Sequence, residues 1–194
     1  FLCKSLRRRF VELRDTGDLW TAALHAQGLL AGLSAEHPAR AFVLWDLACV
    51  SADLSRQLPD TGHLHAAIGY ARAALEASPR DSADAEACRA MLTQLLATPG
   101  VRTDDATALD QAVAIGEESW EEAGPGRRDA LAAALWTRYR ARSVGADLDR
   151  AIEVREDLLS ETTGGAGDGA DRSRQLRALA ELLEERHARA GTPR

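Results

Sequence analysis

The chain has 194 residues, of which 45% are hydrophobic and 28% are charged, ordinary values for a soluble folded protein. Its net charge is −6 and its isoelectric point is about 5.4, which argues against nucleic-acid binding because that binding depends on neutralising phosphates. Alanine, the strongest helix former, makes up about a fifth of the chain, whereas β-branched and aromatic residues are sparse. We therefore expect an all-α fold.

No apolar run reaches about 18 residues, and no signal peptide is visible, so we expect no membrane association and a cytoplasmic location. The three cysteines, Cys3, Cys49 and Cys88, are widely spaced and form no CxxC pair, which argues against a disulfide framework or a zinc site. Cys49 and Cys88 lie among apolar residues at helical spacing. We expect them to be small core residues whose burial raises the thiol pKa and makes them unreactive.

A short motif with the core Leu-x-x-Ala occurs four times along the chain. The four copies are residues 17–24 (GDLWTAAL), 62–68 (GHLHAAI), 107–113 (TALDQAV) and 145–152 (GADLDRAI). Their leucines are Leu19, Leu64, Leu109 and Leu148, at separations of 45, 45 and 39 residues. A motif that recurs about every 40 residues is typical of a solenoid, in which each unit buries its apolar face on the next. Each copy is predicted to begin a helix of about four turns, as in residues 62–77, where apolar residues follow an i, i+3, i+4, i+7 pattern.

Further helices are predicted between these motifs, at residues 38–58, 82–97, 127–142 and 171–190. In 38–58 one face carries Leu44, Leu47, Ala48, Ser51, Leu54 and Leu58. Pro38 is predicted at the first helical position. Short junctions rich in proline and glycine separate the helices. The chain is thus expected to hold about nine helices in antiparallel pairs, as units 1–34, 38–79, 82–124 and 127–163 with a closing helix at 171–190.

One stretch, residues 62–79 (GHLHAAIGYARAALEASP), resembles the second helix of a tetratricopeptide repeat. The positions that match the family pattern are Gly62, Leu64, Ala67, Ala71, Ala74 and Pro79, with alanine at the usually bulky position 71. Residues 145–163 are similar but have Thr163 where the family has proline. The long unit and the junction Thr16–Leu19 resemble arrays of actinobacterial type, which often accompany a caspase-like CHAT peptidase domain or an NTPase switch domain. The resemblance implies a right-handed superhelix whose first-type helices line a concave groove.

Both ends of the chain resemble parts of incomplete repeat units. Residues 1–14 resemble only the end of a first-type helix, and a next unit would start at 191–194. We therefore expect the chain to be part of a longer protein. Alternatively, residues 171–190 form a capping helix with a polar outer face, as terminal repeats require.

Candidate metal and phosphate sites were weighed at three places. Asp147 and Asp149 flank Leu148, but residues two apart on a helix diverge, so we predict that Asp147 is the N-cap and Asp149 meets the helix dipole. The pair His63-x-His65 has no third ligand nearby in sequence. The glycine-rich residues 162–169 lack the preceding strand and the Gly-Lys-Ser/Thr of a phosphate loop, and are predicted to be an inter-helix loop. We expect no metal, no cofactor and no catalytic residue in this chain.

Residues that could bind a partner lie on the predicted first-type helices. They are Trp45, Asp46, Asp53, Trp136, Arg138, Arg142 and Arg177. Tryptophan is a common interface anchor. Arg138 and Arg142, four residues apart, and Arg177 on the next such helix could form a basic strip for acidic peptide ends. The alternatives are that the tryptophans pack between repeats and that the arginines lie on a solvated face.

The sequence therefore favours a non-catalytic scaffold or regulatory sensor segment that binds a protein, a peptide or another domain of the same chain. One alternative is the sensor arm of a CHAT-like cysteine peptidase whose catalytic domain lies outside this chain. Another is a self-associating structural scaffold. The chain has no asparagine and a single lysine, Lys4, which argues against a clamp for chaperone carboxyl-terminal tails.

Overall fold

The computed structural model describes residues 2–58, 62–98, 106–118, 120–162 and 169–191. These residues form nine α-helices and one 3₁₀-helix, with no strand among them, so the expected all-α fold is confirmed. The helices are α1 (Leu2–Leu13), α2 (Thr16–Ala31), α3 (Arg40–Gln57), α4 (Gly62–Ala77), α5 (Ala83–Leu96), α6 (Ala106–Glu117), η1 (Trp120–Glu122), α7 (Pro125–Arg142), α8 (Gly145–Thr162) and α9 (Gly169–Gly191). Most of the glycine-rich stretch, residues 163–168, lies outside the described residues.

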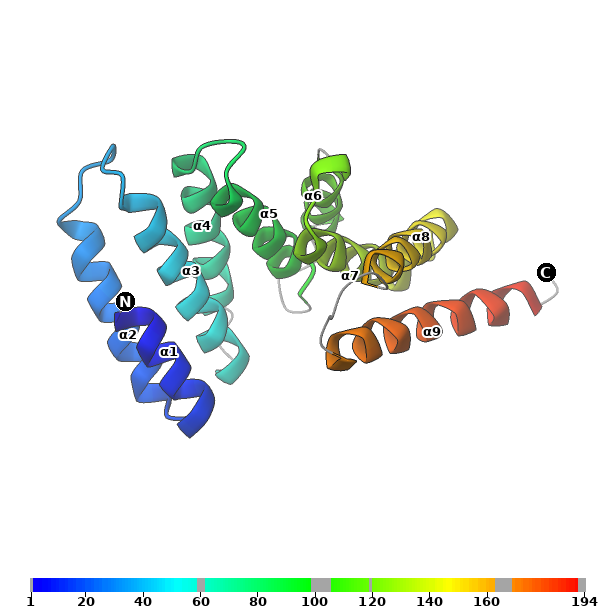
Figure 1. The fold of residues 1–194 in the computed structure, drawn as a ribbon, viewed down its shortest axis with the longest axis horizontal. Coiled ribbons are helices and arrows are strands. Elements are labelled where there is room, and N and C mark those ends of the chain that lie inside the picture. Colours follow the sequence, from blue (N-terminus) through cyan, green and yellow to red (C-terminus); the bar gives the residue numbers. More distant parts are fainter. Residues whose placement is uncertain (1, 59–61, 99–105, 119, 163–168, 192–194) are drawn as a thin grey trace.

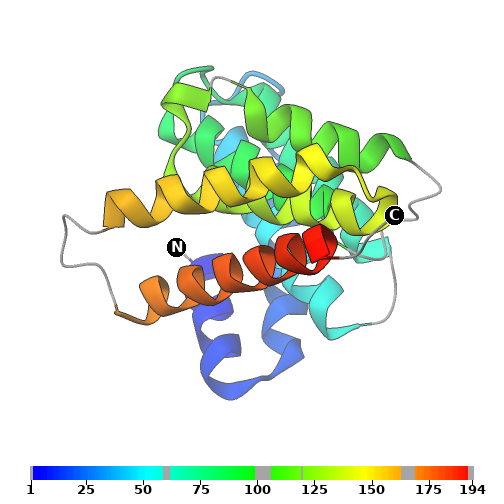
Figure 2. The same ribbon diagram turned by 90° about the vertical axis from the view of Figure 1, so that its right-hand side faces the viewer.

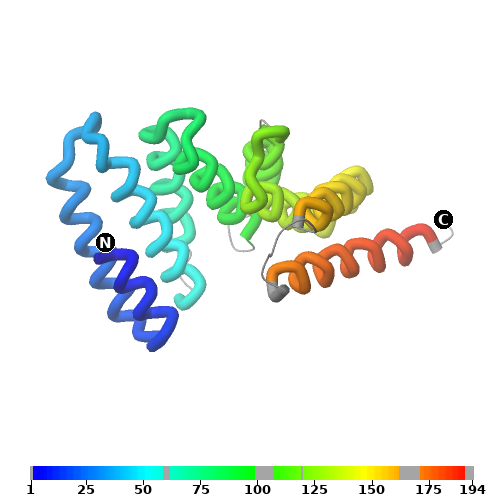
Figure 3. Tube along the Cα trace, in the orientation of Figure 1, coloured from blue at the N-terminus to red at the C-terminus, as the bar shows by residue number. Residues whose placement is uncertain are grey.

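The helices follow one another along a single row, with α1 and α2 at one end and α9 at the other (Figure 1; Figure 3). Each helix packs on its neighbours in the chain, most extensively α3 on α4 and α7 on α8. Helices that are two apart in the chain also contact each other: α1 contacts α3, and α5 contacts α7. Viewed from the far end, α8 and α9 run side by side in opposite directions (Figure 2). The arrangement is a solenoid-like stack, because consecutive helices pack on one another along its length.

The ends of the helices follow local capping chemistry. The Ser82 hydroxyl accepts a hydrogen bond from the Ala85 amide at 3.1 Å, and Asp15 accepts from the Gly17 amide at 2.9 Å, so both are side-chain N-caps. Pro125 occupies the first turn of α7, where its missing N–H costs nothing. The same role predicted for Pro38 is wrong, because the chain makes one more turn and α3 begins at Arg40.

The repeated motif is a packing motif. Its four leucines are all buried, and the four alanines that follow them, Ala22, Ala67, Ala112 and Ala151, are 0% exposed. Alanine leaves the helix surface flat at these positions, so a neighbouring helix can approach closely. The buried apolar side chains form one cluster over α1 to α3, a larger one that extends from α3 to α9, and a small one of Leu44, Ala74 and Cys88 between α3, α4 and α5.

Candidate functional site

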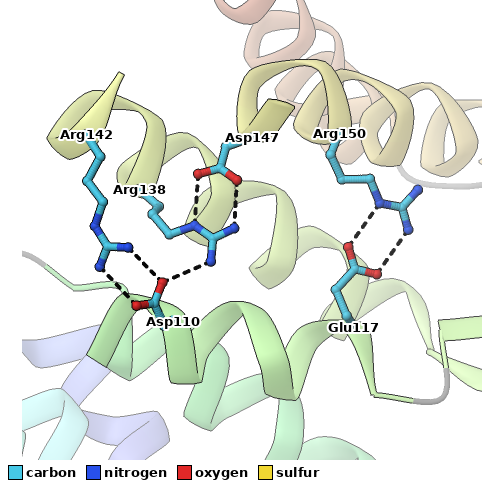
Figure 4. Close-up of polar contacts among 6 residues, drawn as sticks. All are labelled: Asp110, Glu117, Arg138, Arg142, Asp147 and Arg150. Carbon is cyan, nitrogen blue, oxygen red and sulfur yellow. Dashed lines mark hydrogen bonds and ion pairs between the residues drawn. The ribbon is translucent and has the colours of Figure 1, made fainter. Parts of the chain in front are cut away.

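Arg138 and Arg142, predicted as a basic strip, lie at the end of α7 and are bound to carboxylates of the chain itself (Figure 4). Arg138 donates to Asp147 from Nε at 2.8 Å and from Nη2 at 2.6 Å. Its Nη1 donates to Asp110 at 3.1 Å. Arg142 donates to the same Asp110 carboxylate at 2.8 and 3.3 Å. The hydrogen bonds from Arg142, and then the one from Arg138, hold the pKa of Asp110 below its usual value.

This network connects three helices, because Asp110 lies on α6 and Asp147 on α8. A second connection runs parallel to it, where Arg150 of α8 donates to Glu117 of α6 at 3.0 and 3.1 Å (Figure 4). Bidentate arginine–carboxylate pairs of this kind fix orientation as well as adding energy. These ion pairs hold α6, α7 and α8 together. That Arg138 and Arg142 bind a partner stays a prediction.

Asp147 was predicted as the N-cap of its helix, and this prediction is wrong. Because α8 begins at Gly145, Asp147 lies inside the first turn, where its amide donates to the Val144 carbonyl at 3.0 Å. Its carboxylate faces back toward Arg138. Asp149 lies exposed in the same helix.

The remaining predicted residues near this end of the stack are Trp136 and Arg177. Trp136 stacks on Tyr139 at 5.5 Å between ring centroids, beside an open hollow of about 390 Å³. The Tyr139 hydroxyl donates to Glu185 of α9 at 2.8 Å. Arg177 is exposed on α9 and donates to the Ser173 carbonyl of its own helix at 3.3 Å. The structure thus places Arg177 apart from the network of Figure 4.

On α3, Asp53 is bound to the chain's own cations. It accepts from Arg7 of α1 at 2.6 Å and from Arg56 at 2.5 Å. The pair with Arg7 joins α1 to α3, and only 13% of the Asp53 side chain is exposed. Asp53 therefore stabilises the helix packing.

Trp45 and Asp46 lie instead beside two neighbouring hollows of apolar character. The larger, of about 250 Å³, lies between α1, α2 and α3 and is lined by Leu29, Phe42 and Asp46 among others. The smaller, of about 110 Å³, lies between α3 and the start of α5 and is lined by Phe42 and Trp45. Phe42 lines both hollows and is 56% exposed. A large aromatic side chain with this exposure between two hollows is what an interaction surface offers.

Phe42 was missed in the sequence, although a signal was present. The predicted buried face of 38–58 leaves out Phe42, Trp45 and Cys49, which are spaced i, i+3 and i+7 and form a second apolar stripe. A helix with two apolar stripes packs on two sides. In the structure the first stripe meets the core, while the Phe42 end of the second is uncovered by the described residues.

Cys49, Cys88 and His63 are packed against neighbouring side chains. Cys49 and Cys88 are buried as predicted, and desolvation raises the pKa of each thiol to about 11. His63 packs against Trp20 edge to face at 5.3 Å. Within the described residues, no three potential ligands come together as a metal site would need. Among the same residues, no helix is long and apolar enough to cross a membrane.

Comparison with known proteins leaves the chain without an assigned family. No protein-family model matches it, and no curated protein shows significant sequence similarity to it. Function must therefore be argued from the surface itself.

Proposed function

We propose that the chain is a helical-repeat scaffold of tetratricopeptide type, without catalytic activity of its own, that binds a protein partner through the surface around Phe42. The observation that carries this proposal is the exposed Phe42 ring between two apolar hollows. Solvent-exposed apolar surface of this kind costs free energy in an isolated chain and is offset when a partner covers it.

The stack of helices supports the same proposal. In solenoids each unit contacts its neighbours only, which leaves long faces open for binding. The strongest alternative surface, the arginines of α7, is neutralised by Asp110 and Asp147 and offers less free charge.

The proposal is tested by comparing two variants of the full chain. Phe42→Ala removes the exposed ring, and Leu24→Ala removes a still more exposed apolar side chain, 69% exposed, that lines neither hollow. Both chains are used as bait in a lysate of the organism that encodes them, and bound proteins are quantified by mass spectrometry. We expect at least one protein to be depleted about tenfold with Phe42→Ala, the loss typical of an interface anchor, and retained with Leu24→Ala. If no bound protein depends on Phe42, the proposal is wrong.

A further inference from the structure

The smaller hollow lies inside the stack, between α3 and the start of α5, so that helices lie beyond it along the row in both directions (Figure 1). Among the described residues, α5 packs extensively on α7 but not on α3. The two helices are joined instead through the small buried cluster of Leu44, Ala74 and Cys88, in which α4 takes part. Because Cys88 also lines the hollow, this cluster forms its base. The hollow is thus the space that α3 and α5 leave between them.

The lining changes from buried and apolar at the base to exposed at the mouth. Cys88 is 1% exposed, and burial raises the pKa of its thiol to about 11, so the base is uncharged at neutral pH. Trp45 and Ala87 are partly buried and form walls, whereas Phe42 and Asp84 are exposed. The volume of about 110 Å³ is smaller than the roughly 300–1,000 Å³ of sites that hold whole small molecules, and suits a single apolar side chain. Such a side chain would enter with its end against Cys88.

The polar groups of the lining are hydrogen-bond acceptors. The Ser78 hydroxyl donates its proton to the Ala74 carbonyl oxygen at 2.8 Å, which leaves the Ser78 oxygen to accept. Glu86, two residues after Asp84, is paired with Arg127, whereas Asp84 has no cation partner among the described residues. A carboxylate and a hydroxyl oxygen together favour a ligand group with several N–H donors, which is an ammonium or a guanidinium.

The nearest cation of the chain is directed elsewhere. Arg89 follows Cys88, and its charge acts on that thiol. Its guanidinium donates to the Arg80 carbonyl oxygen at 3.2 Å and lies 3.6 Å from the Glu118 carboxylate. Arg89 and Arg80 line a separate hollow, and no lysine, arginine or histidine is among the described residues that line this one. Asp84 is therefore the charged side chain that a partner meets at the mouth.

We propose that this hollow receives one aliphatic side chain of the partner protein, and that a lysine or arginine next to that side chain pairs with Asp84. The inference rests on the proposed function and names the chemistry of its partner. Burial of the aliphatic side chain against Trp45 and Cys88 supplies most of the binding free energy. The ion pair with the exposed Asp84 adds less, and it selects partners that carry a cation beside the inserted side chain.

The test uses a display library of random linear peptides, selected against the full chain. Peptides that also bind an Ala87→Leu chain are removed, because the leucine side chain of this variant fills the hollow. The enriched peptides are synthesised with a fluorescent label, and binding is measured by fluorescence anisotropy. We expect enrichment of an aliphatic residue with a lysine or arginine beside it. Far-ultraviolet circular dichroism shows whether each variant is folded.

Matched variants decide where and how the peptides bind. Ala87→Leu should weaken binding at least about tenfold, whereas Ala133→Leu, at an exposed alanine of α7, should leave it unchanged. Asp84→Asn should weaken binding of the basic peptide about two- to fivefold, the range of exposed ion pairs. For a peptide whose basic residue is replaced by glutamine, Asp84→Asn should change little. This comparison of charges decides the matter even if Ala87→Leu does not fold.

Three results would overturn the inference. The first is that the enriched peptides carry no basic residue, or that Asp84→Asn weakens the basic and glutamine peptides equally. The second is that a folded Ala87→Leu chain binds the synthesised peptides as well as the wild type does. The third is that light scattering shows a dimer that Ala87→Leu dissociates, since a second copy of the chain would then fill the hollow. If proteins that depend on Phe42 are still captured from a lysate, the proposed function stands and only the content of the hollow is wrong.

Discussion

At the scale of single residues, the burial of Asp46 costs stability. Burial in apolar surroundings raises the pKa of this carboxyl group, since the charged form loses its hydration. The folded chain therefore holds the proton more tightly than the unfolded chain, whose aspartates titrate near 3.9. It follows that ionising Asp46 destabilises the fold, an effect present above its folded pKa and absent below about pH 3.9.

Asp46→Asn should therefore be more stable than the wild type at pH 7. As the pH falls through the raised pKa of Asp46, this advantage should shrink, and it should vanish below about pH 3.9. Urea unfolding at a series of pH values measures the difference. A variant that is less stable than the wild type at pH 7 would contradict the argument.

Asp129→Asn provides a control of opposite sign. Burial raises the pKa of Asp129, but the charge of Arg155 and the hydrogen bonds from Gln175 and Arg155 outweigh it, so this pKa lies below its usual value. The stability that Asp129 contributes is present above about pH 3.9 and is lost as the pH falls through its lowered pKa. Its asparagine variant should thus be less stable than the wild type at pH 7, and the deficit should disappear in acid.

At the scale of helices, two helical hairpins, α1 with α2 and α7 with α8, share one design. Arg9 donates to Asp18, and Arg138 donates to Asp147, in each case across nine residues. Both first helices end at a residue with positive φ, Arg14 at 58° and Ser143 at 57°. The turn brings the last turns of one helix beside the first turn of the next, so that the arginine reaches the aspartate. The arginine–aspartate pair therefore recurs in the structure together with the repeated sequence motif.

The helix positions could be predicted from the sequence because apolar spacing and turn residues are local signals. The predicted helix at 62–77 has those bounds in the structure. The pairing of side chains is different, since it depends on how distant segments pack. Arg142 and Asp110 are 32 residues apart, so their ion pair could not be read from the chain. Trp45 and Asp46, which line the two hollows, were predicted to bind a partner from their position on a first-type helix, and that role stays a prediction. Phe42 required recognition of a second apolar stripe.

Close contact between α6 and α7 depends on Gly116. A Cβ atom added at Gly116 would lie 2.9 Å from Cβ and 2.8 Å from Cδ1 of Leu131. Because Leu131 is fully buried, it has no room to move aside. Gly116→Ala should therefore lower the free energy of unfolding by about 1–3 kcal/mol, the usual cost of overpacking. Gly69→Ala, in an exposed part of α4 with open space around it, should instead raise it by about 0.5–1 kcal/mol.

Urea unfolding of the two glycine variants measures both effects. A Gly116→Ala chain as stable as the wild type would show that α6 and α7 can separate without loss of packing.

At the scale of the whole molecule, the described helices share no single central core. Leu19 belongs to the apolar cluster of α1 to α3, and Leu148 belongs to the cluster that extends from α3 to α9. The two clusters meet at α3 and Tyr70. A molecule built in this way has stability that is close to a sum of neighbour-to-neighbour terms, so its two ends can open separately.

Leu19→Ala and Leu148→Ala test this directly, because both leucines are 0% exposed and occupy the same place in the repeat. Each substitution should remove about 3–5 kcal/mol from the packing around it. In hydrogen–deuterium exchange, Leu19→Ala should speed exchange in α1 to α3 and leave α7 and α8 as in the wild type. Leu148→Ala should do the reverse. If either variant speeds exchange equally in all the helices followed, the stack unfolds as one cooperative unit, and the surface around Phe42 would then depend on α8 as much as on the helices that form it.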